Sequence, residues 1–427
     1  MKADIVVENI SSLVTLEGDN KPRTGNEMGN VGLIEDGIIA ISDDKIIYVG
    51  KGKLPQDIQI DNETKIINGE GKTVTPGLID PHTHLVHGGS RENELDMKLK
   101  GMKYLDILEA GGGILSTVRS TKEASFDDLY NKAKNSLDKM LELGMTTVEA
   151  KSGYGLDTET EMKQLRVAKK LNEDHPIDVV STFMGAHAIP KEYKDNVDGF
   201  IDIIINDMLP KVSKENLAEF CDVFCEEGVF SVDQTRKILN EAKKYGMKPK
   251  IHADEIEPLG GAELAAEVEA VSADHLVAAS EKGMEMMADK GVIADLLPGT
   301  CLNLKIGKMA KARKMIELGI PVALSTDYNP GSSPTENIQL IMYLAGLKMN
   351  MTPEEVITAV TINAACSVDR QKEIGSLEEG KKADIAIFNA PNIAYIMYHF
   401  GINHIDKVIK NGKIVVEEGK VKKSQII

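Results

Sequence analysis

Between residues 74 and 366, short apolar segments alternate with amphipathic segments of helical period, and this rhythm constrains the fold more than any other feature. Eight of the short segments are typical of buried strands: GLIDPHTHL, TTVEA, VVSTFMGAH, DVFCE, PKIHA, AVSADHL, GVIADLL and PVALSTD. Each is followed by a helical pattern; in the segment after DVFCE, Ser231 fits an N-cap and Gly246 a helix end. Eight such units in about 290 residues predict a parallel (β/α)8 barrel.

Both ends of the chain have strand and hairpin patterns instead. Asp43-Asp44 and Asn411-Gly412 each stand between alternating apolar positions, which is typical of hairpin turns. Neither end has enough strands for a core of its own, so we expect the two ends to pair. The predicted α/β architecture is a TIM barrel inserted into a small β-sandwich. Its two domains are residues 74–366 for the barrel, and residues 1–73 together with 367–427 for the sandwich.

An open, doubly wound sheet is the main alternative to the barrel. It is disfavoured because no GxGxxG motif follows a strand. The run Gly111-Gly112-Gly113 follows a predicted helix over 104–110, so we interpret it as a helix end.

The chain is acidic, with 50 Lys and Arg against 67 Asp and Glu and a net charge of −17. Such a charge repels nucleic acids and anionic membrane surfaces, so neither is an expected partner. Lys and Arg are spread along the chain, and the nearest thing to a cluster is Lys420, Lys422 and Lys423 near the C-terminal end. We find no signal peptide, no apolar run long enough for a bilayer and no disulfide framework among four Cys, and therefore expect a cytoplasmic protein.

His82 and His84 form the H-x-H pair that ends the first predicted barrel strand. Residues i and i+2 of a strand point to the same side, so both imidazoles should lie inside the barrel near its C-terminal mouth. The pair alone fits two hypotheses equally: two ligands of one metal ion, or two core histidines bonded to backbone carbonyls.

Three more residues end predicted strands: His252 the fifth, His275 the sixth and Asp327 the eighth. A barrel brings all of them to one mouth. Imidazoles and a carboxylate suit zinc or a similar divalent ion that keeps a position open for water. No Lys ends the fourth strand, where CEEG stands, so a lysine-derived bridge to a second metal is excluded and a single ion is expected.

Other residues near the mouth suggest the remaining chemistry. Glu255, three residues after His252, fits a general acid and base beside the metal, or else a solvated loop acid like Glu257. Arg91 fits a clamp for a carboxylate, or a salt bridge to Glu92 or Glu94. Further candidates for polar contact with a substrate, some through backbone amides that hold an anion, are Tyr154, His187, Asn329, Gly331 and Ser332.

These residues and their surroundings resemble the amidohydrolase superfamily of metal-dependent hydrolases. The similarity extends over nearly the whole chain and is carried by HTHLVHGGSRENE, EAKSGYGLDTETEMKQLRVAKKL, STFMGAHAIP, IHADEIEPLGGAELA, SADHLV and STDYNPGSSPTENIQLIM. Within the superfamily the chain most resembles the enzymes of histidine degradation that open the ring of 4-imidazolone-5-propanoate to give N-formimino-L-glutamate.

The resemblance implies a role for each matching position. One zinc or iron ion per chain would be held by His82, His84, His252 and Asp327. The small anionic substrate or its product would contact Arg91, Tyr154, His187, Glu255, Asn329, Gly331 and Ser332. Catalysis would involve Glu255, His275 and Asp327, with His275 near the attacking water. A homodimer is the expected assembly.

Two alternatives share these motifs. A mononuclear deaminase of a heterocycle such as cytosine or guanine has the same ligand pattern, but Arg91 and the NPGSS segment favour an anionic substrate. A non-catalytic scaffold of the same fold would be expected to lack at least one ligand, whereas all of them are present.

Overall fold

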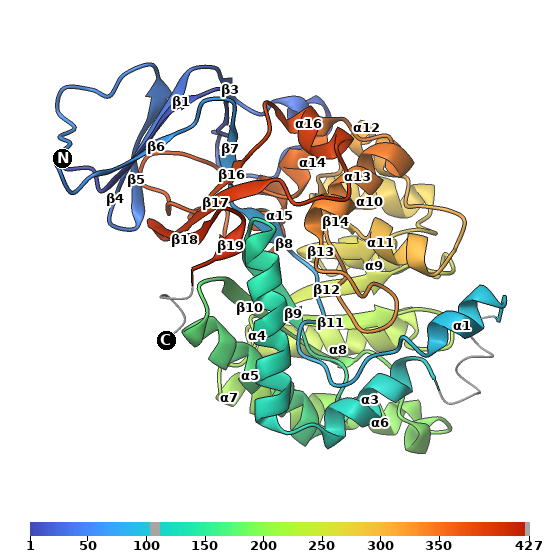
Figure 1. Ribbon diagram of the computed structural model, residues 1–427. Helices are drawn as coiled ribbons and strands as arrows, with labels where there is room; N and C mark the ends of the chain where they lie inside the picture. Colours follow the sequence, from blue (N-terminus) through green and yellow to red (C-terminus); the bar gives the residue numbers. More distant parts are fainter. Residues whose placement is uncertain (103–111, 423–427) are drawn as a thin grey trace.

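The computed structural model describes residues 1–102 and 112–422 and contains the predicted barrel. Its eight parallel strands follow one another in chain order around the sheet (Figure 1). They are β8 (Leu78–Asp80), β9 (Met145–Lys151), β10 (Asp178–Ala186), β11 (Phe220–Cys225), β12 (Lys248–Ala253), β13 (Ser272–His275), β14 (Ile293–Leu296) and β15 (Val322–Leu324). The helix predicted over 104–110 lies outside the described residues.

The first and last barrel strands meet just beyond their C-terminal ends. Thr83 and Tyr328 form a parallel bridge, and the His84 N–H donates to the Tyr328 carbonyl at 2.9 Å. The Asp327 N–H donates to the His82 carbonyl at 3.1 Å. The segments that carry three of the predicted metal ligands, His82, His84 and Asp327, therefore also join β8 to β15.

Helices surround the barrel and cover its strands (Figure 1). Ser231 caps α8 through a capping box with Gln234, as its position predicted, and Ser125 caps α4 through one with Asp128. The helices are η1 (Gly25–Gly29), α1 (Glu94–Leu99), α3 (Ile114–Glu123), α4 (Phe126–Glu142), α5 (Thr158–Asp174), η2 (Lys191–Tyr193), α6 (Val197–Ile203), η3 (Ile204–Met208), α7 (Leu209–Lys214), α8 (Val232–Lys244), α9 (Gly261–Glu267), α10 (Glu281–Lys290), α11 (Pro298–Asn303), α12 (Ala312–Glu317), α13 (Ile338–Met349), α14 (Pro353–Ala359), α15 (Ile362–Ser367) and α16 (Ile393–Tyr398).

Strands from the two ends of the chain form two further sheets. One has the order β5-β4-β1-β6 and the other the order β19-β18-β17-β16-β7-β2-β3. The strands are β1 (Ile5–Ile10), β2 (Ser12–Val14), β3 (Leu33–Ile34), β4 (Gly37–Ser42), β5 (Lys45–Lys51), β6 (Lys65–Asn68), β7 (Thr73–Pro76), β16 (Ile385–Phe388), β17 (Ile405–Lys410), β18 (Lys413–Glu417) and β19 (Lys420–Val421). Both predicted hairpin turns are confirmed, between β4 and β5 and between β17 and β18.

The two ends of the chain pair directly, as predicted. β16 runs antiparallel to β7, with Ile385 opposite Pro76 and Phe388 opposite Thr73. Apolar side chains of both sheets form one core cluster, in which Val7 and Ile39 from the N-terminal part pack with Ile387 from the C-terminal part. The outcome is a β-sandwich beside the barrel (Figure 1).

Two further observations concern the chain as a whole. Over residues 1–102 and 112–422, no helix combines the length and apolar character that a membrane span requires. All four cysteines are buried and carry free thiols.

Candidate active site

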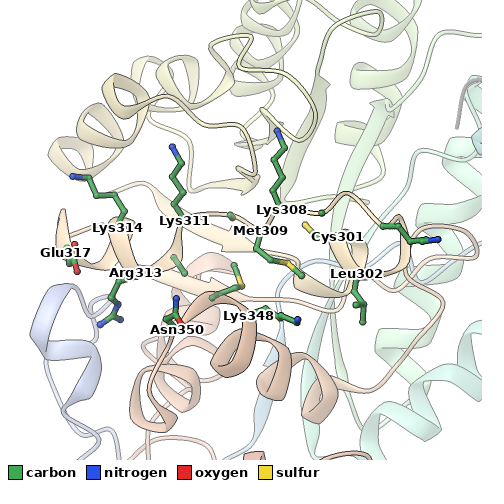
Figure 2. A pocket seen from close by; sticks show the side chains of 15 residues that line it. Cys301, Leu302, Lys308, Met309, Lys311, Arg313, Lys314, Glu317, Lys348 and Asn350 are labelled. Atoms are coloured by element: carbon green, nitrogen blue, oxygen red, sulfur yellow. The ribbon is translucent and has the colours of Figure 1, made fainter. Parts of the chain in front are cut away.

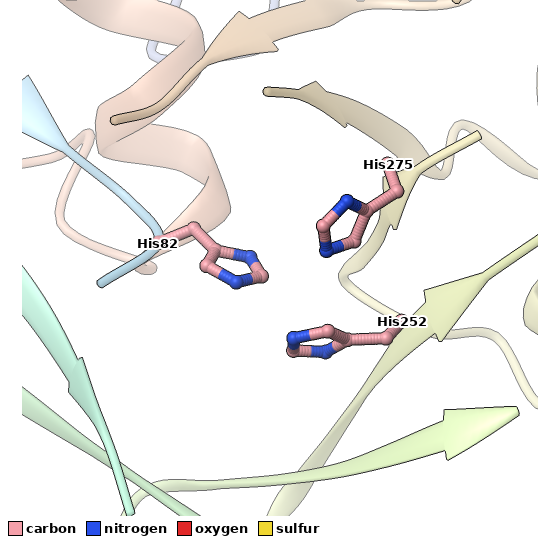
Figure 3. A group of neighbouring side chains, drawn as sticks. All are labelled: His82, His252 and His275. Carbon is pink, nitrogen blue, oxygen red and sulfur yellow. The ribbon is translucent and has the colours of Figure 1, made fainter. Parts of the chain in front are cut away.

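Three imidazoles point toward one another at the mouth of the barrel (Figure 3). His82 follows β8, His252 lies on β12 and His275 ends β13. The ring centroids of His82 and His252 are 4.5 Å apart, and those of His252 and His275 are 5.1 Å apart. One nitrogen from each of the three rings lies within 4.8 Å of the other two. The predicted convergence of these strand ends is thus present in the structure.

His84 and Asp327 complete the cluster from the junction of β8 and β15. The Asp327 Oδ1 atom lies 3.7 Å from Nε2 of both His82 and His84. These separations exceed a hydrogen bond and leave space for a cation between the three groups. The Nε2 atoms of His82 and His252 are buried and have no hydrogen-bond partner among the described residues. Unsatisfied imidazole nitrogens facing a carboxylate fit a metal ion of the zinc class.

Two buried carboxylates hold the other nitrogen of these histidines. Nδ1 of His82 is 2.7 Å from Asp274, and Nδ1 of His252 is 3.0 Å from Asp222. Each Nδ1–H donates to its carboxylate, which directs the free Nε2 toward the cluster. Burial lowers the pKa of both imidazoles well below the usual value, so both rings are neutral and able to act as ligands.

Lys151, at the end of β9, lies between these carboxylates with its side chain fully buried. Its Nζ is 2.8 Å from Asp222, 3.2 Å from Asp274 and 3.0 Å from Glu149. A second group of possible metal ligands lies here, formed by Asp222, His252 and Asp274. The Lys151 ammonium already supplies the positive charge between the two carboxylates of this group. Sequence reasoning missed this group, although charged residues inside apolar barrel strands were a usable signal.

Glu255 lies beside the cluster and belongs to no group of close metal-ligand atoms among the described residues. Its side chain is 12% exposed, and Oε1 is 3.8 Å from His275 Nδ1. Burial, together with the nearby Glu226 carboxylate, raises the pKa of Glu255 to about 7. It therefore differs from an ordinary solvated loop acid and is suited to exchanging protons near neutral pH.

Arg91 is buried, and of its two predicted roles the structure shows the salt bridge to Glu94. Its Nε donates to Glu94 Oε1 at 3.0 Å, so the salt bridge exists, but inside the protein. A Cβ atom added to Gly331 would lie 2.0 Å from the Arg91 Cζ. The guanidinium thus packs directly on Gly331, where glycine is the residue that allows such close approach.

Asn329 organises the turn that follows β15. Its side-chain oxygen accepts hydrogen bonds from the N–H groups of Gly331 at 2.8 Å and Ser332 at 2.7 Å. These two amides therefore donate within the turn rather than toward a separate anion. Asn303, in the 301–307 segment, donates to the carbonyls of Gly331 and Ser332.

Tyr154 and His187 form an aromatic wall next to His84. The rings of His84 and His187 stack with centroids 4.7 Å apart, and the Tyr154 ring is 5.4 Å from His84. Burial lowers the pKa of His187 to about 4, so this ring is neutral. The loop that holds Tyr154 is fixed by buried Glu161, which accepts hydrogen bonds from three backbone N–H groups.

The expectation that Lys and Arg are spread along the chain without a local basic patch is wrong. Six cationic side chains surround a pocket of about 800 Å³ formed by the segments 301–317 and 348–350 (Figure 2). They are Lys305, Lys308, Lys311, Arg313, Lys314 and Lys348. The pocket borders α11, whose Thr300 donates a hydrogen bond to Asp327. The cluster was missed because its charges alternate with apolar residues and form no continuous run.

Comparison with known protein families identifies the family of this chain. The model of the amidohydrolase family matches residues 73–415. The chain therefore belongs to the amidohydrolase family.

Full-length relatives narrow the assignment. An imidazolonepropionase from Alkaliphilus oremlandii is 63% identical over 421 residues, which cover 99% of this chain and 100% of the relative. One from Fusobacterium nucleatum is 56% identical, with coverage of 98% and 100%. Within the family, the chain groups with the imidazolonepropionases.

Solved structures with much lower identity share the fold. A variant of atrazine chlorohydrolase from Arthrobacter aurescens, complexed with zinc and atraton, has a TM-score of 0.75 at 19% identity, covering 98% of this chain and 96% of the other. A 5-methylcytosine deaminase from Klebsiella pneumoniae has a TM-score of 0.72 at 15% identity, covering 97% and 98%. At such identities the likeness supports the architecture alone.

Proposed function

We propose that this chain hydrolyses 4-imidazolone-5-propanoate to N-formimino-L-glutamate, a step of histidine degradation. The observation that carries the proposal is a buried guanidinium, Arg91, packed against a loop that continues directly from Asp327 of the imidazole cluster. Such an arrangement suits a small molecule with a reactive ring at one end and a carboxylate at the other. The full-length identity to imidazolonepropionases supports the same substrate.

We propose His82, His84, His252 and Asp327 as the ligands of one zinc or iron ion per chain. The unsatisfied Nε2 atoms and the facing Asp327 carboxylate support this set. The metal would supply Lewis acidity, which lowers the pKa of water and polarises the substrate carbonyl.

The protein's own groups would carry the remaining chemistry. Arg91 binds the propionate and orients the ring, with Tyr154 and His187 along one side. Glu255, with its pKa near 7, takes a proton from the attacking water as the oxygen adds to the lactam carbonyl carbon. The same carboxyl group then returns the proton to the ring nitrogen as the C–N bond breaks. His275, 3.8 Å from Glu255, is the alternative base.

The decisive experiment offers the purified protein three substrates: imidazolone propionate, cytosine and guanine. We expect formiminoglutamate from the first and no ammonia from the other two. Ammonia release would instead support a heterocycle deaminase. No turnover of any substrate, together with no bound metal, would support a scaffold; we expect about one metal ion per chain.

Further proposals concern the organisation of the protein. We propose a discontinuous sandwich domain of residues 1–73 and 367–427 around a barrel domain of residues 74–366. A homodimer in the cytoplasm, without nucleic-acid or membrane partners, remains a prediction. The six-cation pocket gives a specific reason to test nucleic-acid binding directly.

A further inference from the structure

Lys98 on α1 lies beside the proposed carboxylate site and has no role in the chemistry described so far. Its Nζ donates to the Gly331 carbonyl oxygen at 3.2 Å. The guanidinium of Arg91 packs on the Cα of the same glycine. Two cationic side chains, one from α1 and one from the loop before it, thus meet at one residue of the turn after β15.

Two positive charges and one negative charge lie around Gly331 in the part of the chain that the structure describes. Arg91 forms an ion pair with Glu94, and Lys98 has no ion pair among the described residues. One oxygen of Glu94 is engaged, because Oε1 accepts hydrogen bonds from Arg91 Nε and from the Gly113 N–H at 2.7 Å, whereas Oε2 is buried without a hydrogen-bond partner among the described residues. Lys98 is partly buried, and both this burial and the neighbouring Arg91 lower its pKa. A single anion next to Lys98 would offset both the burial of its ammonium group and the repulsion from Arg91.

We propose that Lys98 is a second substrate-binding cation, which pairs with the carboxylate of the substrate together with Arg91. The inference rests on the proposed function and adds a determinant of substrate charge. Arg91 is fixed by Glu94, whereas the Lys98 ammonium uses one of its three donors, on Gly331, within the described residues. Lys98 therefore selects for an anion, and Arg91 sets the anion's position.

The test compares Lys98→Met with the wild type on two substrates, imidazolone propionate and its uncharged propionamide. A charged hydrogen bond of ordinary strength corresponds to ~10- to 100-fold, so KM for the propionate should rise by that factor while kcat changes less than about threefold. The propionamide should show almost no difference between the two proteins. Lys98→Arg should restore most of the affinity for the propionate.

A purely structural role would make Lys98→Met lose the same factor on both substrates, and this result would overturn the proposal. The matched control is Lys100→Met, since Lys100 is exposed at the C-cap of the same helix and pairs with Asp96. If the wild type fails to hydrolyse imidazolone propionate, the proposed function is wrong. Lys98 is then judged by calorimetry with propionate, which should bind the wild type and Lys100→Met at least about tenfold more tightly than Lys98→Met. Equal binding by all three, or none by the wild type, refutes the assignment.

Discussion

In the two central imidazoles, one nitrogen is held by a carboxylate and the other has no hydrogen-bond partner among the described residues. Asp274 fixes His82, and Asp222 fixes His252. Removing either carboxylate would allow its ring to rotate or change tautomer, so these acids prepare the ligands before any ion arrives.

Arg91→Ala tests the carboxylate clamp. Loss of a charged, geometrically fixed donor should raise KM for imidazolone propionate by ~100-fold, with the metal content unchanged. The substitution also leaves Glu94 buried without its cation, so Arg91→Ala combined with Glu94→Gln is the companion variant. Steady-state kinetics and metal analysis on both proteins measure the effect. An unchanged KM would exclude the clamp.

The raised pKa of Glu255 predicts a pH profile. A base must be ionised to accept a proton, so kcat/KM should decline as the pH falls below about 7, by about tenfold per unit. Glu255→Gln should lose most activity and this acid limb together. Glu257→Gln, on the exposed part of the same loop, should keep the wild-type profile. A wild-type profile that stays flat down to pH 5 would assign the proton transfer to another group.

Single residues at predicted strand ends could be found from the sequence, because strand position determines where a side chain points. His82, His252, His275 and Asp327 were recognised in this way. The roles of Asp222 and Asp274 were not recognised, because the histidines that they bind lie on other strands and far away in the sequence. The pairing of Arg91 with Glu94 was left open, since spacing gives no information on burial.

At the scale of elements, β9 brings charge into the centre of the barrel. Lys151 sits among three buried carboxylates, and Lys250 on β12 lies 3.1 Å from Glu149. Several buried carboxylates close together require positively charged groups beside them. The barrel interior beneath the imidazoles is therefore an ionic layer rather than an apolar one.

Lys151→Met should remove the central counter-charge of that layer. Breaking a buried ion pair from one side costs about 3–5 kcal/mol, and urea unfolding of metal-free protein measures this loss. Lys139→Met, which removes an exposed partner of Glu336, should cost less than about 1 kcal/mol. Similar losses for the two variants would contradict the ionic layer.

At the scale of the whole molecule, another buried lysine ties the barrel to the sandwich. Lys410 on β17 is 1% exposed and bonds to Asp178 of β10 at 2.8 Å and to Asp384 at 2.6 Å. The contact joins a strand of each body, so it favours unfolding of the two as one unit.

Lys410→Met should lower the free energy of unfolding by about 3 kcal/mol or more. It should also split the calorimetric transition into two, because the two bodies lose their buried polar link. Lys413→Met, exposed on the adjacent strand, is the control. A single transition at the wild-type temperature would show that apolar packing alone joins the bodies.

The overall architecture was accessible from the sequence because the βα rhythm and the hairpin turns are local patterns. The β-sandwich was predicted because each end of the chain has too few strands to form a core alone, so the two ends had to pair. The six-cation pocket was overlooked because Lys305, Lys308, Lys311, Arg313 and Lys314 are interspersed with apolar residues, and Lys348 joins them only through folding.

β7 and β16 lie side by side in their sheet, but the ribosome synthesises them at very different times. During translation, β7 emerges before the first barrel strand and β16 after the last, so the barrel can form while the sheet is still incomplete. Until β16 arrives, one edge of β7 carries unpaired backbone groups next to buried Val74. A nascent chain that stalls before Ile385 therefore exposes an unpaired edge strand, which can pair with another chain. The pairing of β16 with β7 is a late folding step that covers this edge.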